Sequence, residues 1–139
     1  MRIFLGILAG IVAALIVQGG LVYLASLVVE MPAVRTVSRE EVAQAVAAAS
    51  ASAHLVTLLS YVIGGLAAVW IGAGIARVSW AGWIGAGLLA TVALASAFLF
   101  PDPAWAQFGA PIAALVGGFI GRHLAPAPPP DADATDTTA

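Results

Sequence analysis

Few side chains in this sequence could carry out acid–base, metal or covalent chemistry. The two histidines, His54 and His123, are far apart, and neither has a second histidine or a carboxylate at the spacing of a metal-ligand pair. There is no cysteine, which excludes thiolate ligands, thiol nucleophiles and disulfides. No Ser/His/Asp set can be assembled, and no glycine-rich loop follows a predicted strand to bind a cofactor phosphate. The sequence therefore predicts no catalytic, metal or cofactor site.

One group of charged and titratable residues does fall within a short stretch of the chain: Arg35, Arg39, Glu40, Glu41 and His54. A lipid-modifying enzyme would need such a group at one membrane interface. However, Ser38 and Glu41 have the spacing of a capping box, in which each side chain bonds the backbone N–H of the other residue. We interpret the group as the exposed start of a helix with a solvated His54, and we predict that the protein is not an enzyme.

Charged residues are excluded from four long runs. All twelve Asp, Glu and Arg residues lie outside residues 3–29, 42–76, 78–101 and 103–121, which are 27, 35, 24 and 19 residues long. About 20 apolar residues in a helix span a hydrocarbon core about 30 Å thick. Only 9% of residues are charged, against about a quarter in soluble domains. The sequence predicts an all-α integral membrane protein with four transmembrane helices in an antiparallel bundle.

The expected domain covers residues 1–125, and its spans are residues 3–29, 53–76, 80–100 and 104–124. The second helix is predicted to begin before its span, at Arg39, and to continue to Ala76. Its 38 residues would measure roughly 57 Å, about twice the hydrocarbon thickness, so its start would extend beyond the membrane.

Prolines mark the other boundaries. Pro32 is expected to end the first helix, and Pro101 and Pro103 separate the last two. Residues 126–139 are rich in Pro, Asp and Thr, have little to bury, and are predicted to be a disordered tail.

Arginine placement predicts the orientation. With both termini inside, Arg2, Arg77 and Arg122 lie on the cytoplasmic side and Arg35 and Arg39 on the other, as the positive-inside rule favours. The Ala-rich, Lys-free composition suggests a bacterial protein, and hence the inner membrane. The formal charge of −2 gives no basic surface for nucleic acid. Three tryptophans near span ends are interpreted as interfacial anchors: Trp80, Trp83 and Trp105.

Small residues recur at spacing four within the spans. Such rows let helix backbones approach closely in lipid, where hydrophobic attraction between helices is weak. We expect them to form helix contacts within the bundle or, alternatively, an interface with a partner, and residues 104–124 carry a second small row that could serve it. Gln18 is expected to hydrogen-bond across the bundle. The principal small residues are Gly6, Gly10, Gly64, Ala68, Gly72, Gly109, Ala113, Gly117 and Gly121.

The segment Phe100-Pro101-Asp102-Pro103-Ala104-Trp105, followed by a Gly-rich helix that ends at Arg122, resembles a group of small uncharacterised bacterial four-helix inner-membrane proteins. The resemblance implies the same fold and location and carries no activity. Members often have His between the two prolines and acidic residues late in the first helix, whereas this chain has Asp102 and an apolar stretch.

Two functions remain open from the sequence. The first hypothesis is a structural or accessory subunit that packs as a homo-oligomer or within a larger membrane complex. It rests on the rows of small residues and on the lack of catalytic groups. The alternative is a small channel or facilitative transporter for a neutral solute, which would need no ionisable residue within the spans.

Overall fold

The computed structural model describes residues 1–28, 38–99 and 103–125, and every regular element in those ranges is a helix. Four of the five helices are long and apolar enough to cross a membrane. These two findings confirm the prediction of an all-α chain with four helices of spanning length. The helices, in chain order, are α1 (Arg2–Ser26), α2 (Arg39–Ala48), α3 (Ala51–Ala76), α4 (Ser79–Leu99) and α5 (Ala104–Leu124).

The helix ends agree closely with the predicted spans. α5 has the bounds predicted for it, and α4 begins one residue early, at Ser79. α1 ends at Ser26 rather than at residue 29. The predicted stop at Pro32, the break at Pro101 and the tail of residues 126–139 lie outside the described residues.

The prediction of one continuous helix from Arg39 to Ala76 was wrong. The helix ends at Ala48 and a new one begins at Ala51, because Ala49 and Ser50 adopt extended backbone with ψ of 139° and 159°. The Ser50 hydroxyl accepts a hydrogen bond from the backbone N–H of Ala53 at 3.3 Å and so caps α3.

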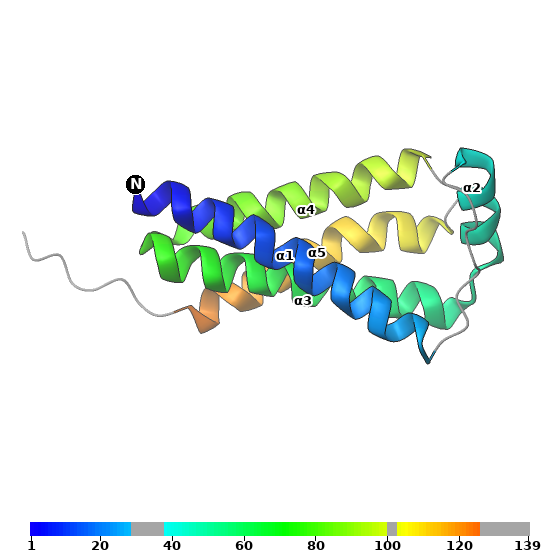
Figure 1. The fold of residues 1–139 in the computed structure, drawn as a ribbon, viewed down its shortest axis with the longest axis horizontal. Coiled ribbons are helices and arrows are strands. Elements are labelled where there is room, and N and C mark those ends of the chain that lie inside the picture. Colours follow the sequence, from blue (N-terminus) through cyan, green and yellow to red (C-terminus); the bar gives the residue numbers. More distant parts are fainter. Residues whose placement is uncertain (29–37, 100–102, 126–139) are drawn as a thin grey trace, which may run out of the picture.

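The projecting start of the predicted helix is therefore a separate short helix. The hydroxyl of Ser38 caps α2 by accepting from the backbone N–H of Glu41 at 3.2 Å, which is one half of the expected capping box. Figure 1 shows α2 lying across one end of the four long helices rather than extending along their axes.

α3 is the central helix: it packs against α1, α4 and α5, and its contacts with α1 and α5 are the most extensive in the bundle. The chain passes from α3 to α4 through Arg77 and Val78. Arg77 has φ 59° and ψ 19°, a left-handed conformation that helix ends adopt, and its N–H bonds the carbonyl of Ala73 at 2.8 Å. This tight turn places α4 directly beside α3.

The sizes of the buried and exposed side chains are the reverse of those in a soluble protein. The most buried positions include Ala68, Ala86 and Ala114, all fully enclosed, while soluble proteins enclose mainly large apolar side chains. The large side chains instead cover the outside, and the most exposed include Phe4, Ile16, Tyr23, Phe98 and Phe108.

Candidate functional site

The small residues of α1 and α3 face each other. A Cβ added to Gly6 would lie 2.5 Å from the Ala76 Cβ, and one added to Gly10 would lie 2.7 Å from the Ala68 carbonyl oxygen. Gly64 faces the backbone of Ala14. A larger residue at either α1 glycine would therefore meet backbone or a buried side chain of α3.

The glycines of α3 and α4 form a similar close contact. A Cβ added to Gly72 would lie 2.9 Å from the Cα of Gly82, and one added to Gly82 would lie 2.6 Å from the Cα of Val69. Gly85 faces both Ala68 and the backbone of α1. α3 and α4 thus touch backbone to backbone at this level.

Both small rows of α5 are used within the chain. Along the first row, Gly117 lies against the Val62 carbonyl and Gly121 against the Leu66 carbonyl. Gly109 contacts the Leu58 side chain, and Ala113 packs against the core. The second row, for which the sequence analysis considered a partner, is also largely enclosed: Ala106, Ala114 and Gly118 are buried, and Ala110 is half-buried.

Gln18 does not form the bond across the bundle that its sequence position suggested. Its side chain is half-buried and its Cβ lies against Gly64, but its amide makes no hydrogen bond to the described part of the protein. Of the tryptophans, Trp80 and Trp105 are exposed, while Trp83 is half-buried against Gly118.

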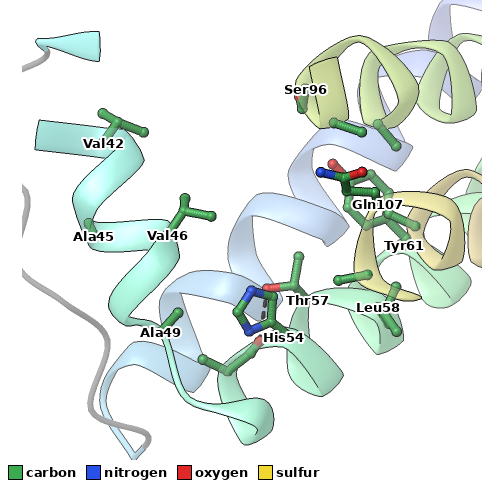
Figure 2. A pocket seen from close by; sticks show the side chains of 15 residues that line it. Val42, Ala45, Val46, Ala49, His54, Thr57, Leu58, Tyr61, Ser96 and Gln107 are labelled. Carbon is green, nitrogen blue, oxygen red and sulfur yellow. Dashed lines mark hydrogen bonds between the residues drawn. The ribbon is translucent and has the colours of Figure 1, made fainter. Parts of the chain in front are cut away.

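A cavity of about 280 Å³ lies between α2 and the neighbouring ends of α3, α4 and α5 (Figure 2). α2 closes one side with Val42, Ala45, Val46 and Ala49. The spacing of three and four residues places Val42, Ala45 and Val46 on one face of the helix, and Ala49 follows directly after the last helical residue. α2 does not pack closely against the long helices, so the cavity separates it from them.

Polar side chains from three helices line the same cavity. Thr57 of α3 donates its hydroxyl to the Ala53 carbonyl at 3.0 Å, and Ser96 of α4 donates to the Val92 carbonyl at 2.9 Å. The Nδ1 atom of His54 lies 3.0 Å from the Ser50 carbonyl. Because a carbonyl only accepts, this contact assigns a proton to Nδ1.

Gln107 of α5 is the remaining flexible polar group of the lining. Its side chain is half-buried and, like Tyr61, lines the wall of the cavity (Figure 2). Its amide makes no hydrogen bond to any residue that the structure describes. An amide has two N–H donors and a carbonyl acceptor, so Gln107 can exchange hydrogen bonds with a molecule in the cavity.

No carboxylate, lysine or arginine belongs to the described lining of this cavity. Its polar groups are hydroxyls, one amide and one imidazole, in a wall that is otherwise Ala, Val and Leu. A few fixed polar groups in a mostly apolar wall are typical of small-molecule sites. The arrangement favours binding of a neutral molecule over acid–base chemistry.

The sequence analysis singled out His54, but nothing in the residue spacing joins it to Gln107, which lies more than fifty residues further along the chain. These two residues meet at one cavity because the first turns of α3 and α5 pack together at the same end of the bundle. The turn at Ala49 and Ser50, which the sequence did not predict, places α2 over these ends. The interpretation of His54 as a solvated residue was wrong, since it is 9% exposed and makes an edge contact with Trp105 at 5.7 Å between ring centroids. The apolar face of α2 was the feature of the sequence that could have indicated this cavity.

Comparisons with protein-family models, curated proteins and solved structures found no match for the chain. The resemblance to small four-helix membrane proteins therefore stays a prediction, and the functional argument rests on the geometry of the chain itself.

Proposed function

We propose that the chain is an integral membrane protein whose four long helices cross the bilayer in alternating directions. The exposed large apolar side chains and the small buried ones support this, because lipid can solvate the former and close backbone packing needs the latter. The contacts of Gly6 with Ala76 and of Gly64 with Ala14 support opposite directions for α1 and α3.

The arginines support an orientation with both termini in the cytoplasm of a bacterial inner membrane. With alternating helices, three arginines (Arg2, Arg77 and Arg122) fall at one end of the bundle, and one arginine, Arg39, falls at the other with Glu40 and Glu41 of α2. Positive charge is retained on the cytoplasmic side of membrane proteins.

Single cysteines test this topology, because the natural chain has none. We expect a membrane-impermeant maleimide added to intact cells to label Ser38→Cys in the α2 region. Ser79→Cys at the start of α4 should react only after the membrane is opened. The reverse pattern would overturn the orientation, and labelling of both sites from outside would overturn the alternating spans.

For the activity, we propose non-catalytic binding of a small neutral molecule in the cavity beneath α2. The observation that carries this is the Gln107 amide, which has no hydrogen-bond partner among the described residues, at a 280 Å³ space whose described lining is neutral. That volume lies near the lower end of the roughly 300–1,000 Å³ range of ligand pockets.

The accessory-subunit and channel hypotheses stay predictions with less support. All nine small residues singled out from the sequence meet other parts of the same chain, so an interface made through them would have to open the bundle. The cavity lies at one end of the bundle. Further along the bundle, Gly65 packs against Ala114 and Gly82 packs against Val69. These contacts support a closed site rather than a passage.

Photolabelling tests the proposed binding. The protein in lipid nanodiscs is irradiated with neutral 3-trifluoromethyl-3-phenyldiazirine or with its 4-carboxylate analogue, and labelled residues are mapped by mass spectrometry. We expect saturable neutral labelling within residues 42–61, and carboxylate labelling there more than about tenfold lower, because an unpaired buried charge costs several kcal/mol. Labelling spread evenly over the lipid-facing side chains would overturn the proposal.

A further inference from the structure

The polar groups of the cavity also select among neutral ligands. We infer that the cavity beneath α2 binds a lipophilic alcohol, whose hydroxyl pairs with the Gln107 amide while its apolar body fills the remaining space. This inference rests on the proposed binding function and adds the chemical class of the ligand.

Two hydroxyls of the lining, those of Thr57 and Ser96, can accept a hydrogen bond but have already donated their proton. Thr57 and Ser96 each direct the hydroxyl proton to a carbonyl of their own helix, at 3.0 Å and 2.9 Å. A hydroxyl oxygen that donates its one proton still has lone pairs for a second partner. The hydroxyl oxygens of Thr57 and Ser96 can therefore accept a hydrogen bond from a ligand.

The Gln107 amide requires a ligand that both accepts and donates a hydrogen bond. Its N–H groups need an acceptor and its carbonyl needs a donor, and neither has a protein partner in the described chain. A ligand hydroxyl supplies both functions. An ether or an ester supplies only an acceptor, and a hydrocarbon supplies neither, so each leaves part of the amide without a partner.

The rest of the lining specifies an apolar body without charge. α2 contributes Val42 and Val46, and α3 contributes Leu58 beside small alanines. A fatty acid is disfavoured, because no arginine or lysine in the described lining could pair with its carboxylate. An alcohol carries no charge at any physiological pH and partitions into the membrane that surrounds the helices.

Matched photoprobes test the ligand class on the full chain in nanodiscs. The probes are a diazirine-bearing 1-dodecanol and its methyl ether, which differ in the ability to donate a hydrogen bond and in one methyl group. We expect saturable labelling of the cavity by the alcohol at about three- to tenfold lower concentration than by the ether, the range that one net hydrogen bond provides.

Two variants assign this preference to Gln107. Gln107→Leu should reduce the preference for the alcohol, because only hydroxyl oxygens of the lining would remain to accept from it. Gln18→Leu should keep the full preference, since it removes an amide that also lacks a described partner but lies outside the cavity. Circular dichroism checks that both variants are folded. The wild-type comparison needs no variant, so the test stands even if Gln107→Leu fails to fold.

The outcomes separate the inference from the function on which it rests. Equal labelling of the wild-type cavity by alcohol and ether would overturn the alcohol assignment and leave neutral-ligand binding intact. A preference that Gln107→Leu leaves undiminished would likewise overturn the role of this amide. Absence of saturable labelling in the cavity by any neutral probe would overturn the proposed function itself.

Discussion

Replacing Gly117 by leucine is expected to lower the free energy of unfolding by about 3 kcal/mol, the upper part of the usual range for overpacking. A Cβ at this position would collide with the carbonyl oxygen of Val62, which is backbone of the central helix and cannot turn aside. α5 would have to move away from α3. Thermal unfolding in a mild detergent, followed by tryptophan fluorescence, measures the change.

Gly87→Leu is the matched control for this prediction. Gly87 also lies inside a long helix, but a Cβ added there meets no atom within 4 Å. We expect a change within about 0.5 kcal/mol, as for most surface substitutions. If both variants lose the same stability, the loss would come from the Gly-to-Leu change itself and not from the contact between α3 and α5.

Replacing Ala97 by tryptophan is expected to reduce neutral-probe labelling of the cavity by more than about tenfold. Ala97 lies on α4 and lines the 280 Å³ cavity, so the indole would occupy the space that a ligand needs. Losing most of the apolar contacts of a small ligand costs more than the 1.4 kcal/mol that corresponds to tenfold. Saturable photolabelling with neutral 3-trifluoromethyl-3-phenyldiazirine measures the effect.

Ala95→Trp controls for the added indole, because Ala95 lies on the same helix, is exposed, and does not line the cavity. It should keep wild-type labelling. Unfolding temperatures of both variants show whether Ala97→Trp acts by filling the cavity or by damaging the bundle. Full labelling of a folded Ala97→Trp would place the probe elsewhere and contradict the assigned site.

The long helices could be predicted from the sequence because exclusion of charge is a strong signal over 20 residues. The break at Ser50 was missed because the surrounding segment is mostly Ala and Ser, so one continuous helix and two capped ones have similar local preferences. Because a single long helix was predicted, nothing in the sequence indicated that α2 lies across the end of the bundle.

The packing residues could be named in advance, but their partners could not. Spacing identifies Gly64 as a small position on a face, whereas the structure shows that the adjacent Gly65 makes a much closer contact, against the backbone of Ala114 of α5. Gly64 faces α1, so the pair serves two neighbours at once. Which neighbouring helix each glycine contacts depends on the register between helices, and a single sequence does not show that register.

The cavity could not be predicted from the sequence for both of these reasons, the missed break at Ser50 and the unknown register between helices. Its residues come from α2, α3, α4 and α5, and only the turn before Ser50 brings the apolar face of α2 over the ends of the others. The spacing of Val42, Ala45 and Val46 predicts that this face is covered, but not by what. The hydrogen bonds that identify the polar groups as a candidate site are visible only in the structure.

The central place of α3 has a consequence for biosynthesis. Chains are made from the N-terminus, so α1 leaves the ribosome before α3, yet its closest contacts are with α3. Gly6 cannot meet Ala76 until some seventy further residues have been synthesised. In the proposed membrane topology, α1 waits alone in lipid with its glycine face uncovered, and the insertion machinery or a quality-control protease meets it in that state first.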